Sequence, residues 1–249
     1  MEEKKENRMG VMPIGKLLFS MSTPMVISFL VQSLYNIVDS IFVARYSPDA
    51  LAAVSLAYPI QILMIAVSVG TGVGVNALLS RLLGEGKKDR AKVTADNAVL
   101  LAIIASIAFA IFGAIGTKAF FNAQTNSDSI RSLGYSYLSI VSIFSFGLIL
   151  EVTYERILQS TGKTIYNMIT QGVGAIINII LDPILIFGLL GAPKLGVAGA
   201  AIATVTGQII AMILSFVFNM IYNEEVDISF GKHIFKPDFI IIKDIYKVG

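Results

Sequence analysis

The chain has 249 residues, of which 55% are hydrophobic and 14% are charged, whereas about a quarter of the residues of a soluble domain are charged. This composition, with a mean hydropathy of +0.76, excludes an ordinary soluble domain. The net charge of +2 is spread over several loops, and with no Cys and one His the sequence offers no disulfide framework, no thiolate metal site, no nucleic-acid-binding face and no enzyme-like pairing of a nucleophile with a base.

The first 16 residues, MEEKKENRMGVMPIGK, mix acidic and basic side chains. A signal peptide begins with a positively charged segment and has an apolar core of about 7 to 15 residues, whereas the apolar run that follows here is longer. We therefore expect residues 1–16 to be a cytoplasmic amino-terminal segment that leads into a retained first transmembrane helix.

Six long runs follow that are almost free of charge. A helix needs about 20 apolar residues to cross a hydrocarbon core of roughly 30 Å, because lipid offers backbone N–H and C=O groups no partners outside the helix. The runs are 17–44, 50–80, 97–117, 132–150, 164–193 and 195–223. They predict an all-α polytopic membrane protein with a six-helix transmembrane lobe over 17–223, followed by a cytoplasmic or interfacial segment over 224–249.

Basic residues in the short loops predict the orientation. The amino terminus, the loop after the second run, the loop after the fourth run and the tail are rich in Lys and Arg, whereas the alternate loops hold few. Since basic loops stay on the cytoplasmic side, we expect a multi-pass protein of the plasma (inner) membrane with both termini in the cytoplasm. Turn-forming residues at 47–49, 84–86 and 191–193 are expected to end the first, second and fifth helices.

Two of the runs contain an acid, Asp39 in the first and Asp182 in the fifth. A carboxylate near the bilayer centre costs about 3 kcal/mol, so such an acid is a functional candidate. Counted at about 1.5 Å per residue from Arg45 and Lys194, both acids lie in the outer half of the membrane at similar depth. We predict that the two carboxyls share one polar cavity. The alternative is that each acid only hydrogen-bonds a neighbouring helix and strengthens the bundle.

Further polar side chains precede the acids at helical spacing or lie near the outer ends of the fourth and sixth helices. These candidates for the same cavity are Gln32, Tyr35, Asn36, Asn178, Tyr137 and Thr204. For the two hydroxyl residues on the fourth and sixth helices, ordinary packing is an equally good interpretation.

Pro24 and Pro183 are expected to bend the first and fifth helices, because proline lacks a backbone donor and clashes with the carbonyl one turn earlier. Pro183 also disfavours helical geometry at Asp182 itself. Broken helices of this kind are where transporters build ion sites. Glu151, Glu155 and Arg156 fall just after the fourth run, and we interpret them as a cytoplasmic helix end explained by snorkelling or by an ion pair with the arginine.

Five segments carry a family resemblance. NIVDSIFVA at 36–44 and LAAVS at 51–55 resemble the first-helix signature of MATE (multidrug and toxin extrusion) transporters, and NIILDP at 178–183 resembles their fifth-helix signature. LQSTGK at 158–163 and GVAGAAIAT at 196–204 stand where the family has its fourth-to-fifth loop and its sixth helix. The chain is therefore similar to the amino-terminal six-helix half of a MATE transporter of the prokaryotic DinF-like branch.

The resemblance implies an antiporter that exports drugs or other xenobiotics as H⁺ or Na⁺ enters, with no other cofactor. It also implies roles for individual residues. The cation or proton site, which could hold Na⁺, would consist of Asp39, Asn178, Asp182 and Thr204, with Gln32 and Tyr137 beside it and a bend at Pro24. Relatives often place an amide where this chain has Glu155. Because the family has twelve helices in two lobes, a carboxy-terminal lobe is expected to be missing here.

The expected partners are a small cationic or amphipathic substrate, the lipid bilayer and the second lobe. Two other functions remain open. A lipid-linked precursor flippase of the same superfamily would favour several cationic residues inside the cavity, whereas the runs hold acids and no interior Lys or Arg. A six-helix channel or scaffold subunit would have no reason to bury two acids at matched depth.

Overall fold

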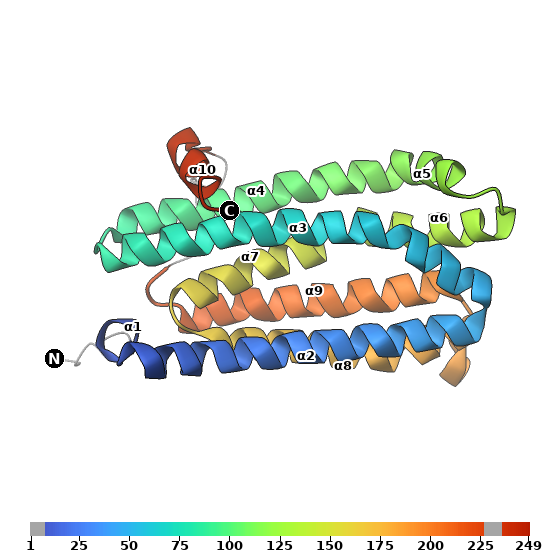
Figure 1. Cartoon of the computed structure of the whole chain (residues 1–249), viewed down its shortest axis with the longest axis horizontal. Helices are drawn as coiled ribbons and strands as arrows, with labels where there is room; N and C mark the ends of the chain where they lie inside the picture. Colours follow the sequence, from blue (N-terminus) through green and yellow to red (C-terminus); the bar gives the residue numbers. More distant parts are fainter. Residues whose placement is uncertain (1–7, 227–235) are drawn as a thin grey trace.

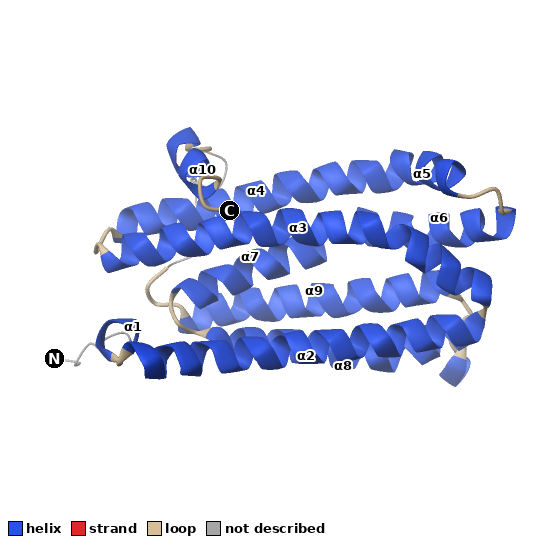
Figure 2. Cartoon of the chain, viewed as in Figure 1, coloured by secondary structure: helices blue, strands red, loops and turns tan. Residues whose placement is uncertain are grey.

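The computed structural model describes residues 8–226 and 236–249, and every regular element in these stretches is a helix (Figure 2). In chain order these are α1 (Arg8–Val11), α2 (Ile14–Tyr46), α3 (Pro48–Gly84), α4 (Lys88–Ile111), a π-helical turn (Phe112–Gly116), α5 (Thr117–Gln124), α6 (Asp128–Ile143), α7 (Phe146–Ser160), α8 (Thr164–Phe187), a 3-10 turn (Leu189–Gly191), α9 (Val197–Tyr222) and α10 (Phe239–Ile245). The predicted all-α fold is confirmed. Parts of the two expected cytoplasmic segments, 1–7 and 227–235, lie outside the described residues.

The long helices lie alongside one another in one elongated bundle (Figure 1). Within the described residues, five spans are long and apolar enough to cross a membrane: α2, α3, α4 continued through α5, α8 and α9. The pair α6 and α7, bent by 42° at a short break, makes a sixth when it is counted as one span. The short α10 packs on α3 and α4 at the outside of the bundle.

Local sequence explains where the helices end. Ser47 separates α2 from α3, and its side chain accepts a hydrogen bond from the backbone N–H of Ala50 at 3.0 Å. Pro48 then takes the first helical position, where a missing N–H removes no helical bond. At the end of α8, Gly188 adopts the left-handed conformation with φ 75°. The expectation that 191–193 end the fifth helix is therefore wrong, because the terminating glycine comes earlier.

The fourth span differs from the continuous helix expected over 132–150. It breaks between Ile143 and Phe146, and no proline marks the break. Just after it, Gly147 lets α7 approach α9 closely, since a Cβ there would lie 3.0 Å from Ile209 Cγ1. The bend turns α7 into the bundle, and this helix continues to Ser160, well beyond the predicted end.

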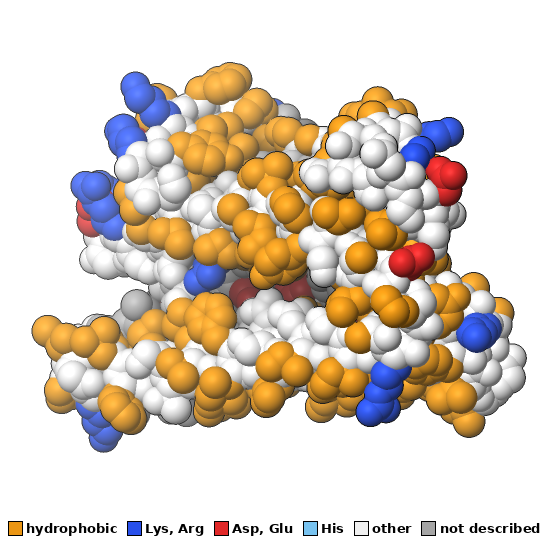
Figure 3. All heavy atoms as spheres, turned by 45° about the vertical axis from the view of Figure 1, so that its right-hand side comes forward, with side chains coloured by type: hydrophobic (Ala, Val, Ile, Leu, Met, Phe, Trp, Pro, Cys, Tyr) orange, Lys and Arg blue, Asp and Glu red, His pale blue; other side chains and the backbone are white. Residues whose placement is uncertain are grey.

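Apolar side chains are spread over the whole face seen in Figure 3, and most of its Lys and Arg side chains lie toward the two ends, with one beside the central hollow. Acidic side chains are visible at the floor of a hollow in the middle of this face. Such a distribution suits a bundle that crosses a bilayer, because the charged ends reach water while the apolar belt meets lipid.

Glycines let α8 and α9 pack closely against each other. A Cβ on Gly207 would lie 2.7 Å from the carbonyl oxygen of Gly174, and a Cβ on Gly199 would lie 2.5 Å from that of Leu185. Small residues that let two backbones meet are a main source of helix association in lipid. These contacts therefore set how α9 is placed against α8.

Gly207→Ala should destabilise the protein, because the added methyl group meets a carbonyl on the backbone of α8 that has to move. We expect a loss of about 1 to 3 kcal/mol, seen as a lower midpoint of thermal unfolding in detergent. Gly172→Ala is the matched control, since a Cβ at that position of α8 has no atom within 4 Å. Equal midpoints for the two variants would contradict the role given to this contact.

Candidate functional site

Asp39 on α2 and Asp182 on α8 lie side by side inside the bundle. The two helices pack along each other, and the acids are only 9% and 0% exposed. Their carboxyl groups are within hydrogen-bonding reach of each other. Two ionised carboxylates at this separation repel strongly, so the pair is stable when it shares a proton or binds a cation. The structure thus brings together the two acids that the sequence singled out.

Asn178 connects this acid pair to α9. In the amide orientation that satisfies both of its ends, its nitrogen donates to Asp182 Oδ2 at 3.2 Å. Its oxygen accepts from the hydroxyl and from the backbone N–H of Thr204, both at 3.2 Å. Asp39 Oδ1, in contrast, is buried without a hydrogen-bond partner among the described residues. The four side chains therefore form one cluster of oxygen atoms that still lacks a donor or a cation.

A cavity of about 570 Å³ opens beside Asp39, among α2, α3, α6, α7 and α9. We call it the large cavity, and its volume lies within the range of about 300–1,000 Å³ that is typical of small-molecule sites. Its other polar lining side chains are Gln32, Tyr35, Asn36, Ser40, Tyr58, Gln61, Tyr137, Thr204 and Gln208. The remaining lining is mostly aliphatic, and no Lys or Arg belongs to it among the described residues.

The predicted companions occupy different parts of this cavity. Gln32 and Tyr35 are half-buried, whereas Asn36 is exposed and belongs to the rim. Tyr137 is buried and its hydroxyl accepts a hydrogen bond from Gln61 Nε2 at 3.0 Å. Gln61 is missing from the sequence prediction, although an amide inside an apolar run is a signal of the same kind as Asp39.

Neither predicted proline interrupts its helix. Pro24 lies inside the continuous α2 and Pro183 inside the continuous α8, which keeps its helical form past Asp182 as far as Phe187. The expected loss of helical geometry at the acid is therefore wrong. Packing against neighbouring helices holds a proline-containing membrane helix together, because other groups satisfy the freed carbonyl.

Glu151 and Glu155 are placed differently from the sequence interpretation. They are 8% and 6% exposed and face the interior from α7, so snorkelling does not explain them. No ion pair joins either acid to Arg156 among the described residues, and that guanidinium donates instead to Gln159 Oε1 at 2.7 Å. The interpretation as a cytoplasmic helix end is wrong because the fourth span bends and carries both acids into the bundle.

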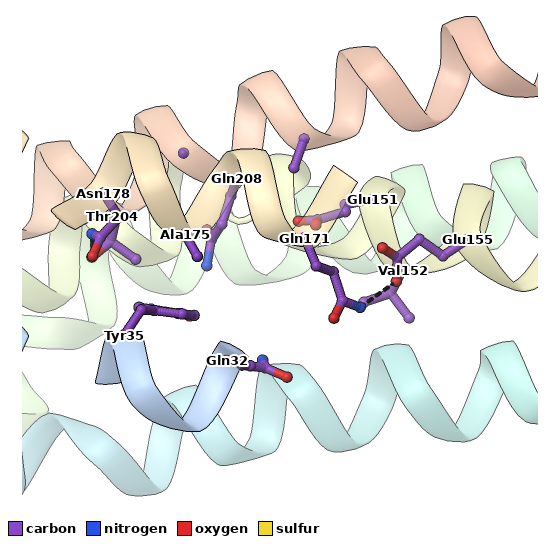
Figure 4. Close-up of a pocket in the computed structure, with 13 residues that line it drawn as sticks. Gln32, Tyr35, Glu151, Val152, Glu155, Gln171, Ala175, Asn178, Thr204 and Gln208 are labelled. Atoms are coloured by element: carbon purple, nitrogen blue, oxygen red, sulfur yellow. Dashed lines mark hydrogen bonds between the residues drawn. The ribbon is translucent and has the colours of Figure 1, made fainter. Parts of the chain in front are cut away.

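Both acids line a second, smaller cavity of about 70 Å³, which we call the small cavity (Figure 4). Gln32 and Tyr35 face it from α2, and Gln208 and Thr204 face it from α9. These four residues also line the large cavity. The two cavities are therefore neighbours separated by shared side chains.

Known proteins resemble most of this chain. The MatE family model matches residues 24–184. A FAD transporter of Shewanella oneidensis is 33% identical over 203 residues, which are 82% of this chain and 45% of that protein. A probable multidrug resistance protein NorM of Thermotoga maritima is 29% identical over 242 residues, which are 95% of this chain and 50% of that protein.

Among solved structures, an outward-facing multidrug resistance MATE family transporter of the MOP superfamily matches with a TM-score of 0.84 at 29% identity. The match covers 92% of this chain and 50% of that one. The chain thus spans about half the length of the curated relatives it matches.

Tyr137→Phe should destabilise the protein, because it removes the acceptor of the Gln61 amide in a poorly hydrated cavity. We expect a loss of about 1 kcal/mol in unfolding free energy, measured by thermal unfolding in detergent. Tyr135→Phe is the matched control on the same helix, since that side chain is exposed. A Tyr137→Phe protein as stable as the control would show that the hydrogen bond contributes nothing.

Proposed function

The chain belongs to the MatE family of membrane transporters, and on that premise we propose that it exchanges an organic substrate for inward-moving H⁺ or Na⁺ bound at Asp39 and Asp182. The observation that carries this proposal is the buried contact between the two carboxyls. A proton shared by the pair, or a Na⁺ ion held with Asn178 and Thr204 as neutral oxygen ligands, would remove the repulsion between them. Either ligand is a monovalent cation, so its inward movement could be coupled to export of the substrate.

The large cavity supports a small organic substrate. Its volume suits a drug-sized molecule, and its mixture of aliphatic and amide side chains offers apolar contact with a few directional hydrogen bonds. Its nearest charged group is Asp39, which favours a cationic or amphipathic molecule over an anionic one. Cation and substrate then compete, because each one alters the charge that the other meets.

A flavin dinucleotide is the second candidate substrate, since one relative is a FAD transporter. The diphosphate of such a molecule would require cationic partners. The described lining of the large cavity contains none, so we favour a cationic or neutral xenobiotic. The same absence weighs against a lipid-linked precursor flippase, and the buried acid pair weighs against a passive channel or scaffold subunit.

We further propose that the protein works in the plasma membrane with both termini in the cytoplasm and with a second lobe of similar size. The half-length match to its relatives supports the second lobe. Basic loops support the orientation. Substrate would then pass between the two lobes.

Pro24 supplies a mechanical step in this proposal. It removes one backbone hydrogen bond from α2, the helix that carries Asp39, and α2 packs chiefly on α8. Once a cation neutralises the acid pair, the polar side of α2 has less reason to stay hydrated. Swinging of α2 about the proline would then shrink the large cavity and displace the substrate.

Asp39→Asn and Asp182→Asn should each abolish cation-coupled efflux by the complete transporter while leaving folding and membrane insertion intact. The amide keeps the shape of the acid and removes its charge. Efflux of a fluorescent cationic dye from vesicles under an imposed H⁺ or Na⁺ gradient measures the effect. Asp49→Asn, a change at an exposed acid at the start of α3, should transport normally. Gradient-dependent efflux by either site variant would overturn the assignment.

Pro24→Ala should insert and fold normally yet export the dye several-fold more slowly, because it restores the missing backbone bond and stiffens α2. The comparison uses the same vesicles, with Pro59→Ala on α3 as a second proline variant outside the acid pair's helix. A Pro24→Ala transporter with an unchanged rate, or a dye affinity that ignores pH and Na⁺ in the unmodified protein, would refute the swinging step.

A further inference from the structure

The small cavity contains a pair of acids that the coupling site does not use. Glu151 and Glu155 lie one turn apart on α7, so their side chains project from the same face of the helix. Both are more than nine-tenths buried. Two carboxylates at this spacing in a membrane interior repel, and each carries a large desolvation cost when ionised. The pair therefore needs compensation from its surroundings.

Glu155 receives that compensation from α8. Gln171 Nε2 donates to its Oε2 at 2.8 Å (Figure 4). The Thr170 hydroxyl lies 3.0 Å from its Oε1 and shares its proton between this oxygen and the Asn167 carbonyl at 2.9 Å. Hydrogen bonds donated to the carboxyl oxygens offset part of the cost of burying the charged form. Glu155 is thus partly compensated by its neighbours on α8.

Glu151 receives no such compensation. No hydrogen bond or ion pair to its carboxyl exists among the described residues, although the side chain lines the cavity and is directed into it (Figure 4). Two further oxygens of the same cavity are buried without partners, Gln171 Oε1 and Gln208 Oε1. A buried acceptor that lacks a partner costs about 1 to 3 kcal/mol, and two of them beside a carboxyl that faces the same space indicate a site for a positive or hydrogen-donating species.

The charged and titratable neighbours of Glu151 do not supply this positive or hydrogen-donating group. Arg156 turns away, since the stem of its side chain lies against Gly72 of α3 and its guanidinium binds Gln159. From α2, Tyr35 is within electrostatic range of Glu151 on one side and of Asp39 and Asp182 on the other. The remaining lining contributes amides, a threonine and small or aliphatic side chains.

We propose that Glu151, with the free amide oxygens of Gln171 and Gln208, forms a second binding site for one monovalent cation, either H⁺ or Na⁺, beside the Asp39 and Asp182 site. The volume of about 70 Å³ admits an ion or a few waters and excludes an organic molecule. A proton on Glu151 turns its carboxyl into a donor toward an amide oxygen, whereas Na⁺ is held by the three oxygens directly. Either cation would give the unpartnered oxygen atoms a bonding partner.

The second site communicates with the first through α2. Gln32 and Tyr35 border both cavities, and the charges of Glu151 on one side and of the Asp39 and Asp182 pair on the other act on the tyrosine between them. A cation at one site lowers the negative potential at the other, so occupancy of the two sites is negatively coupled. The small cavity then binds an ion transiently as it moves to or from the acid pair.

The test counts cations on the purified chain in detergent. At saturating radioactive Na⁺ and neutral pH, we expect two ions per unmodified chain and one in Glu151→Gln if the ligand is Na⁺. If the ligand is H⁺, the component of the protonated-carboxyl infrared band that belongs to Glu151 should disappear in Glu151→Gln and persist in Asp39→Asn, whereas the component from the acid pair should persist in Glu151→Gln. Glu224→Gln, at an exposed acid after α9, is the matched control and should behave as the unmodified chain in both measurements.

Unchanged Na⁺ stoichiometry together with an unchanged infrared titration in Glu151→Gln would overturn the second site. If that variant does not fold, Gln208→Met removes a free amide oxygen and keeps both acids, and it should weaken Na⁺ affinity or shift the pH midpoint of the carboxyl band. If neither change occurs, that result also counts against the proposal. Failure of the acid-pair mechanism is distinguishable, because it would leave Asp39→Asn without effect while Glu151→Gln still loses its cation.

Discussion

The contact between Gly174 and Gly207 is the constraint on which the polar interior depends. With no side chain at either position, the backbones of α8 and α9 meet there, and the helices run antiparallel from that point. In one direction the contact sets Asn178 against Thr204 beside the acid pair. In the other direction it sets the amides of the small cavity opposite each other. Both polar regions therefore depend on the same close approach.

The acid pair could be predicted from the sequence because lipid penalises a lone charge so heavily that an acid in an apolar run rarely lacks a function. The expectation that the two acids lie at similar depth rests on two helix ends. Asp182 lies nearer its helix end than the distance to Lys194 suggests, since Gly188 stops α8 early. Asp39 also lies close to the end of its helix, at Tyr46. The two acids thus remain level although one of the two helix ends was misplaced.

Glu151 and Glu155 show where sequence reasoning stops. Charged residues just beyond an apolar run ordinarily mark a helix end in water, and the neighbouring arginine offered a ready ion pair. What overrides this pattern is tertiary: a break without proline before Phe146 redirects α7 into the bundle. Directly after the break, α7 meets α9 at Gly147, which is a contact between segments far apart in the chain.

The packing of α2 mainly on α8, with little contact to its chain neighbour α3, has a consequence for biogenesis. The ribosome must add most of the remaining spans before the helix that carries Asp182 exists, which takes on the order of ten seconds at roughly 5 to 20 residues per second. Throughout that interval Asp39 sits in a newly inserted helix without its partner, at a cost of about 3 kcal/mol. During that interval a protonated Asp39 would cost less in the bilayer than an ionised one, because the neutral carboxyl loses less hydration.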